Sequence, residues 1–167
     1  FGPFAMTLLL FSICFTTVVG AELAADWHNN ILLLLLVLLI AIIVLCSCLR
    51  QLVPSWAYPF LIVAIAFCLL FHVSLISPYL IGYDVHGEYY FARLTALNSI
   101  WDRTLPDPSG YNGMLSITIL PVMCSTVLGA DLDGIFKNMY PLLYSLVPLV
   151  LYLAYRKQTS PRIAFLS

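Results

Sequence analysis

The chain has 167 residues, of which 62% are hydrophobic and only 9% are charged, and its formal net charge is −1. A soluble domain carries about 25% charged residues, so this chain has too few charges to cover a surface that faces water. Together with a mean hydropathy of +1.00, this composition excludes a soluble globular protein, a disordered chain and a nucleic-acid binder. It indicates an integral membrane protein.

Apolar runs along the chain predict the membrane topology, because a spanning helix takes about 17–25 residues. Runs that predict a span cover residues 3–19, 31–49, 56–77 and 135–155, and residues 20–30 read as a polar loop. The run at 114–128 is shorter and has Pro121 near its middle. We therefore interpret it as an interfacial or re-entrant segment.

Basic residues near the ends of the runs predict the orientation. If residues 114–128 do not span, the inner loops hold no acidic residue and these basic ones: Arg50, Arg156, Lys157 and Arg162. If they do span, only Arg50 and Lys137 remain inside. The first topology is favoured. It has four spans and both termini in the cytoplasm, and it places all eight acidic residues on the outer side.

The polar stretch at 79–113 contains a predicted helix over residues 84–101. Its apolar residues recur at helical spacing and would form one face lying along the outer membrane interface: Tyr90, Leu94, Leu97 and Trp101. Asp84 and Glu88, four positions apart, share a face near the N-terminal end of this helix.

Two carboxylates so placed can hold a divalent cation or divide the roles of base and stabiliser. A plainer interpretation is that Asp84 caps the helix and that Glu88 interacts favourably with the helix dipole. The spacing of the two acids does not choose between these interpretations.

Aromatic residues crowd the same region and form either an aromatic belt at the headgroup level or a wall that contacts sugar or lipid. They are Tyr79, Tyr83, Tyr89, Tyr90, Phe91, Trp101 and Tyr111. Asp131 to Gly134 read as a turn before the last predicted helix. Lys137, at the outer mouth of that helix, either extends to headgroups or meets a phosphate.

The order of these features is distinctive. The segment Gly-Tyr-Asp-Val-His-Gly-Glu-Tyr-Tyr-Phe-Ala at 82–92 follows a span, and Leu105 and Pro106 follow the predicted helix. A short apolar segment ending at Gly129, a polar turn and a helix ending at Arg156 and Lys157 come next. Over residues 56–157 this order resembles the N-terminal part of the GT-C superfamily of glycosyltransferases. It is similar to protein mannosyltransferases, aminoarabinose transferases and predicted archaeal membrane proteins.

The resemblance implies a cell-membrane enzyme that transfers a sugar from a polyprenyl-phosphate donor on the extracytoplasmic face. It implies that Asp84 acts as general base or metal ligand, that Glu88 assists, and that Mg or Mn is the cation such a pair would hold. The other residues it implicates, in neutralising the lipid phosphate or contacting the substrate, are Arg93, Arg103, Lys137, Tyr89 and Trp101. Where many members have Lys-Pro, this chain has Tyr111, Asn112 and Gly113.

We therefore expect an all-α, multi-pass transmembrane helical bundle with an outer loop of interfacial helices. Residues 1–55 would hold two N-terminal spans with short loops. Residues 56–157 would form the GT-C-like piece, with span 56–77, outer loop 78–134 and span 135–155. Residues 158–167 would be a cytoplasmic segment leading to a further span, so the chain would be the N-terminal portion of a longer protein.

An alternative is a non-catalytic, multi-pass subunit that packs on a larger membrane complex, with the outer loop as its docking surface. A transporter fragment is less favoured, because no predicted span carries a central charge.

Overall fold

A computed structural model describes residues 2–48 and 53–167, and over these ranges the chain is helical, with no strand. Arg50 and the end of the predicted second span fall outside the described residues. The helices are α1 (Pro3–Trp27), α2 (Ile31–Cys48), η1 (Ser55–Ala57), α3 (Tyr58–Leu75), α4 (Asp84–Asn98), η2 (Tyr111–Gly113), α5 (Leu115–Thr118), α6 (Leu120–Leu128), α7 (Leu132–Gly134), η3 (Ile135–Met139), α8 (Tyr140–Tyr144), α9 (Val147–Tyr155) and α10 (Pro161–Leu166).

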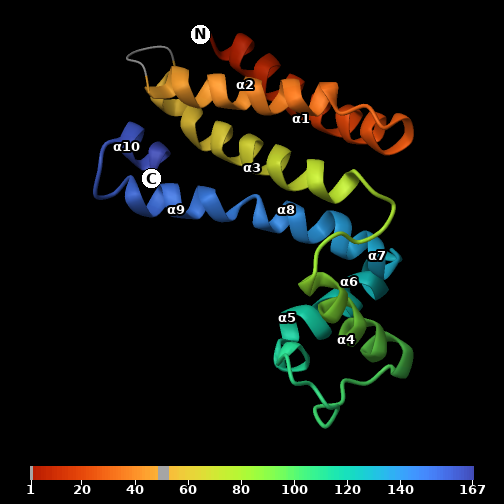
Figure 1. Ribbon diagram of the computed structural model, residues 1–167. Helices are drawn as coiled ribbons and strands as arrows, with labels where there is room; N and C mark the ends of the chain where they lie inside the picture. The colour runs from red at the N-terminus through yellow and green to blue at the C-terminus, as the bar shows by residue number, and fades with distance from the viewer. Residues whose placement is uncertain (1, 49–52) are drawn as a thin grey trace. The chain divides into compact units, whose positions relative to one another are not determined.

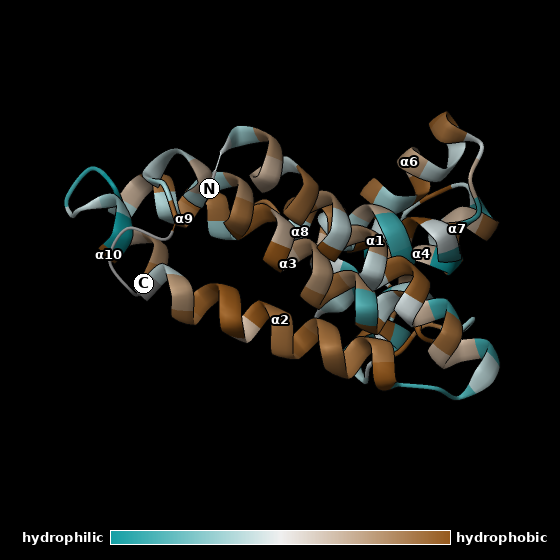
Figure 2. Ribbon diagram, turned by 90° about the horizontal axis from the view of Figure 1, so that it is seen from above, coloured by the Kyte–Doolittle hydropathy of each residue, from teal (hydrophilic) through white to brown (hydrophobic). Residues whose placement is uncertain are grey.

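Three helical runs in the described part are long and apolar enough to cross a membrane: Pro3–Trp27, Ser55–Leu75 and Leu132–Tyr155. The described apolar part of α2, Ile31–Ser47, is slightly shorter than these runs, although Figure 2 shows it to be hydrophobic along nearly all its length. Leu115–Leu128 is shorter still. The all-helical class is confirmed for the described residues, and three of the four predicted spans are long enough to cross a bilayer.

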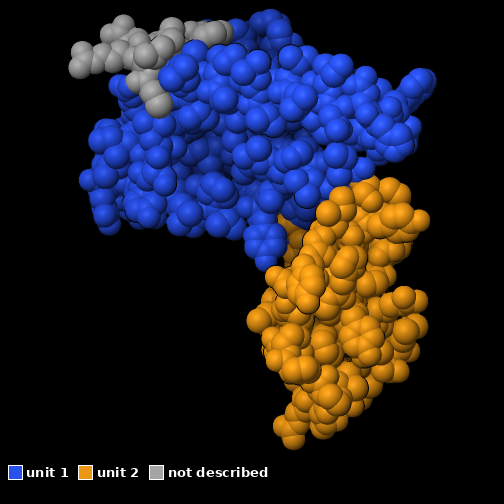
Figure 3. All heavy atoms as spheres, viewed as in Figure 1, with its two compact units in different colours: residues 1–76, 141–167 blue, residues 77–140 orange. Residues whose placement is uncertain are grey.

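The chain divides into two compact units, residues 1–76 with 141–167 (unit 1) and residues 77–140 (unit 2) (Figure 3). Unit 1 contains α1, α2 and α3 as long helices, together with the shorter α9 (Figure 1). Its core is built of aliphatic side chains from the first three of these helices, including Ile13, Leu36 and Leu61. Near the C-terminus, the short helix α10 packs on α3 and α9, with Phe165 stacked on Tyr58 at 4.8 Å between ring centroids.

Helix α1 continues through the first part of the predicted polar loop at 20–30. Ala21, Leu23 and Ala24 are strong helix formers, and Ala21 and Ala24 are buried. At Gly20 an added Cβ would lie 2.9 Å from Leu33 Cδ2, so this glycine permits close contact between α1 and α2. The loop prediction failed here because burial against a neighbouring helix outweighs the local polarity of the sequence.

The last predicted span, at 135–155, starts three residues earlier than expected and is interrupted near both of its prolines. The Asp131 side chain caps its start by accepting a hydrogen bond from the Gly134 N–H at 3.2 Å. Pro141 has no N–H and disfavours the normal helical register. The Tyr140 N–H bonds the Ile135 carbonyl five residues back, so η3 is a turn of π-helix, a feature often found at functional sites.

In unit 2, α4 begins at Asp84 as predicted and ends at Asn98, before Trp101. Its buried residues are Phe91, Ala92 and Thr95. Within the predicted apolar stripe, Tyr90 and Leu97 are 57% and 71% exposed. Tyr90 and Leu97 therefore lie on the surface of unit 2, where an interfacial helix would need them, whereas Leu94 is half-buried.

The packing of α3 in unit 1 can be tested with two leucine truncations on this one helix. Leu61 is fully buried and Leu69 is 44% exposed. Because truncation of a buried leucine leaves a cavity, Leu61→Ala should lower the free energy of unfolding by about 2–4 kcal/mol. Leu69→Ala should cost less than about 1 kcal/mol. Chemical unfolding of the purified chain in detergent measures both, and equal losses would contradict the packing described here.

Candidate functional site

The two predicted catalytic acids lie in the first turns of α4. Asp84 is the first helical residue and is exposed, and Glu88, one turn later, is half-buried. Tyr83 occupies the N-cap position, and no described side chain forms a capping hydrogen bond there. The interpretation of Asp84 as the helix cap is therefore wrong, although Asp84 still lies in the first turn, where the helix dipole favours a negative charge.

Tyr111, in η2, contacts Asp84 although the two residues are 27 positions apart in the sequence. Its hydroxyl donates a hydrogen bond to Asp84 Oδ1 at 2.8 Å. The ring of Tyr111 lies against α4 at Gly87, where an added Cβ would be only 2.9 Å from Tyr111 Cε2. The glycine between the two acids thus leaves the space through which Tyr111 reaches Asp84.

The proton affinities around this contact are shifted. Partial burial, and then the negative charge of Asp84, raise the pKa of Glu88. The hydrogen bond to Asp84 raises the pKa of Tyr111, and burial and the charges of Asp84 and Glu88 add to this effect. Tyr111 is therefore held as a hydrogen-bond donor, and Glu88 keeps its proton to a higher pH than an ordinary glutamate does.

The carboxylates of Asp84 and Glu88 are also the kind of oxygen ligand that Mg²⁺ or Mn²⁺ prefers. Two carboxylates alone do not complete an octahedral shell, and the described residues contain no group of three or more His, Cys, Asp or Glu side chains placed to hold a metal. A cation held by Asp84 and Glu88 would take its remaining ligands from water or from a substrate phosphate, as Mg²⁺ commonly does.

Tyr89 and Arg93, both predicted to contact substrate, belong to a different face of α4. Arg93 follows Asp84 by nine positions, which is about half a turn around the helix axis. Burial, and then a hydrogen bond to Asp133, raise the pKa of Tyr89, while the charge of Arg93 lowers it. The Tyr89 ring also meets Phe136 edge-on at 5.6 Å. The structure therefore groups Tyr89 with the start of the last helix, and Arg93 lies near Tyr89 and not near Asp84.

The remaining predicted contacts have other positions. Lys137 Nζ donates to the Ser77 carbonyl at 2.6 Å, so it holds the start of unit 2 to η3. Arg103 is exposed in a turn beyond α4. Trp101 lies after the helix ends, and its indole N–H donates to the backbone and side-chain oxygens of Asn112 at 3.0 and 3.1 Å. Trp101 thus folds the loop, which its helical spacing did not predict.

Asn112 is the residue that the sequence interpretation missed. It is only 4% exposed, and its side-chain amide donates to the Asp102 carbonyl at 2.8 Å. Its backbone N–H donates to the Asp107 carboxylate. A signal for this fold existed in the sequence. Asp102 precedes Thr104, and Asp107 precedes Ser109, by two positions, the spacing at which an aspartate bonds the backbone two residues on, and both bonds form.

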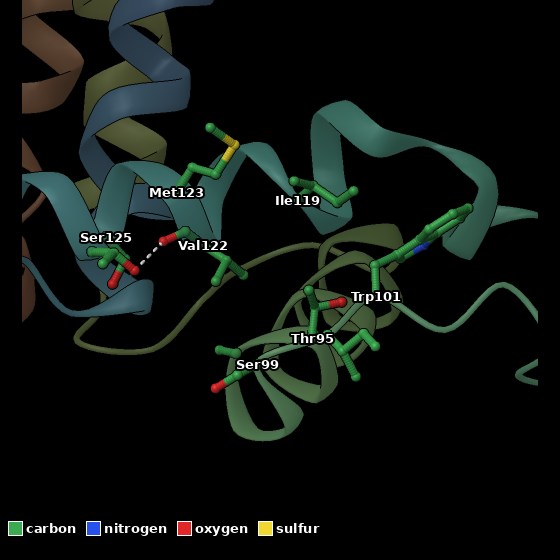
Figure 4. A pocket seen from close by; sticks show the side chains of 10 residues that line it. Thr95, Ser99, Trp101, Ile119, Val122, Met123 and Ser125 are labelled. Carbon is green, nitrogen blue, oxygen red and sulfur yellow. Dashed lines mark hydrogen bonds between the residues drawn. The ribbon is translucent and has the colours of Figure 1, made fainter.

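A hollow of about 480 Å³ lies between α4 and α6 (Figure 4). Thr95 and Ser99 line it from the α4 side, and Val122 and Met123 line it from the α6 side. The Thr95 hydroxyl donates to the Phe91 carbonyl, so its proton is not directed at a ligand. The hollow lies at the C-terminal end of α4, and neither Asp84 nor Glu88 lines it.

The raised pKa of Glu88 predicts a pH-dependent effect on stability. The folded chain binds this proton more tightly than the unfolded chain, so stability falls as the pH rises from the ordinary glutamate value through the raised one. At pH 7, Glu88→Gln should raise the free energy of unfolding by a fraction of a kcal/mol, since solvent still screens the site. At about pH 3, well below the ordinary glutamate pKa of about 4.3, the gain should vanish, because glutamate is then protonated in both states.

Thermal unfolding in detergent at the two pH values measures this difference. Glu22→Gln is the matched control, since Glu22 is an exposed glutamate on α1, and it should have little effect at either pH. A loss of stability at pH 7 in Glu88→Gln would show that ionised Glu88 is stabilised by its surroundings, contrary to the shift described here.

No family model matches the chain, and no curated protein or solved structure matches it either.

Proposed function

We propose that this protein is a multi-pass membrane glycosyltransferase of the GT-C type that uses a polyprenyl-phosphate-linked sugar on the extracytoplasmic face of the cell membrane. The observation that carries the proposal is the arrangement at the start of α4. Asp84 is exposed with one oxygen anchored by Tyr111, and the pKa of its neighbour Glu88 is raised. Carboxylates with shifted proton affinities are typical of acid–base sites.

A membrane location is supported by the three long apolar helices. Many of the large side chains on α1, α2 and α3 face outward, among them Phe11, Leu34 and Phe60, which are 69%, 68% and 57% exposed. Monomeric soluble proteins rarely expose continuous apolar surface of this kind, whereas lipid would cover it. With the charge distribution of the loops, this favours an orientation in which both termini are cytoplasmic and unit 2 is outside.

In the proposed reaction Asp84 removes the proton from an acceptor hydroxyl or amide. The acceptor atom then bonds to the anomeric carbon of the sugar while the bond from that carbon to the phosphate oxygen breaks. The electron pair leaves with the polyprenyl phosphate. Glu88, when protonated, can donate a hydrogen bond to the acceptor or to the leaving phosphate, which is a role that its raised pKa suits.

Basic residues are needed to stabilise the departing phosphate. Arg103 is exposed, so a lipid headgroup can reach it, whereas Arg93, also exposed, lies on the opposite face of α4 from Asp84. The Lys137 ammonium is held at the Ser77 carbonyl. If Mg²⁺ or Mn²⁺ takes part, Asp84 and Glu88 are its protein ligands and the donor phosphate supplies further oxygens. Transfer would then be lost on chelation with EDTA and restored by the added cation.

Replacement of Asp84 tests the function. In membranes carrying the full-length protein and supplied with radiolabelled polyprenyl-phosphate hexoses and pentoses, Asp84→Asn should reduce transfer by at least about 100-fold, the usual contribution of a general base. Asp26→Asn is the matched control, because Asp26 is an exposed acid on α1, and it should retain transfer. Membrane insertion of both variants should equal that of the wild type.

Retention of transfer by Asp84→Asn would contradict the assignment of Asp84. If the wild type transfers none of these sugars and is isolated in fixed stoichiometry with other membrane proteins, the alternative of a non-catalytic subunit is favoured.

A further inference from the structure

The loop between α4 and η2 is closed by one buried side chain. The backbone and side-chain oxygens of Asn112 accept a hydrogen bond from the Trp101 indole N–H. The side-chain amide of Asn112 donates a hydrogen bond to the Asp102 carbonyl, and its backbone N–H donates one to the Asp107 carboxylate. These bonds join the two ends of the loop. Because Asn112 is almost fully buried, truncation of its side chain would remove its bonds to Trp101 and Asp102 and destabilise the closed loop.

Tyr111 directly precedes this closing residue, so the bonds that fix Asn112 also fix the backbone from which the Tyr111 side chain projects. The 3₁₀ turn of η2 adds hydrogen bonds from the Gly113 N–H to the Gly110 carbonyl at 3.3 Å and from the Met114 N–H to the Tyr111 carbonyl at 3.0 Å. The missing side chain at Gly87 then allows the ring to lie on α4. Three separate constraints thus direct one hydroxyl to Asp84 Oδ1.

An exposed aspartate in the first turn of a helix would otherwise rotate about both side-chain bonds. A catalytic group works best when its orientation is fixed before the reactant arrives, because the conformational entropy of its side chain is then lost on folding and not in the reaction step. A hydrogen bond to Oδ1 leaves Oδ2 as the oxygen presented to a reactant.

We propose that Tyr111 is a positioning residue of the Asp84 site, and that the loop closed by Asn112 is the element that holds it there. The catalytic meaning of this role depends on the function proposed above, whereas the contact itself does not. Tyr111 does not touch the substrate. It sets the direction of the carboxylate that does.

The contact can be measured without any substrate by nitration with tetranitromethane, which attacks the phenolate form of tyrosine. Because its hydroxyl donates a hydrogen bond to Asp84 Oδ1 at 2.8 Å, Tyr111 in the wild type should be nitrated several-fold more slowly than Tyr79, which is 78% exposed. Asp84→Asn replaces the charged acceptor with a neutral one, which weakens the hydrogen bond, and should speed the nitration of Tyr111 while leaving the rate at Tyr79 unchanged. Peptide mass spectrometry reads the two positions separately.

The positioning role is measured by kinetics in the full-length protein. Tyr111→Phe keeps the ring on Gly87 and removes only the hydroxyl, so kcat should fall about 10-fold with little change in the KM for the lipid-linked donor. Asn112→Ala should also lower kcat and should speed the nitration of Tyr111, since the loop is then released. Tyr155→Phe is the control, because Tyr155 is an exposed tyrosine on α9, and its kinetics should match the wild type.

The outcomes separate this proposal from the proposed function. Fast nitration of Tyr111 in the wild type, unaffected by Asp84→Asn, would overturn the contact whatever the enzyme assay gives. Asp84-dependent transfer with an unchanged kcat in Tyr111→Phe would overturn the positioning role while the proposed function stands. Slow nitration together with no transfer by the wild type would overturn both the function and the catalytic role of Tyr111, leaving a structural contact.

Discussion

The hydrogen bond from Tyr111 to Asp84 is the interaction on which the candidate site depends. It connects the first turn of α4 to a short helix 27 residues later. It needs a glycine at position 87, where a larger residue would meet the Tyr111 ring. It also needs the loop bonds of Asn112, without which the Tyr111 backbone would be free to move. The site is therefore a property of unit 2 and not of α4 alone.

The parts of the fold that could be predicted from the sequence are those with local causes. The apolar runs gave the long helices, because an uninterrupted hydrophobic segment has few alternatives to a helix in lipid. Helix α4 starts at Asp84 as expected, and the last helix is interrupted near Pro141 and Pro148, where a backbone donor is missing. The extension of α1 to Trp27 was missed because it depends on the buried contacts of Gly20 and Ala24 with other parts of unit 1.

Most of the site could not be predicted, because its contacts join residues that are far apart in sequence. Asp84 and Glu88 were found by their spacing, whereas Tyr111 carried no periodic signal that pointed to Asp84. The family resemblance also implicated Tyr89 and Arg93 beside the acids, although the Tyr89 hydroxyl bonds Asp133 and Arg93 lies about half a turn around the helix from Asp84. Trp101 matched a helical stripe, but the chain leaves the helix at Ser99, whose φ is 54°, and its indole bonds the loop. A one-dimensional pattern identifies candidate residues and does not show which of them meet.

The central claim, that Tyr111 and Asp84 act together, is tested most directly by a double-mutant cycle on the stability of the chain in detergent. The free energy of unfolding would be measured for the wild type, Asp84→Ala, which removes the acceptor oxygen, Tyr111→Phe and the double variant. A hydrogen bond to a charged group predicts a coupling energy of about 1 kcal/mol or more. Additive effects, with a coupling energy near zero, would contradict the contact and with it this account of the site.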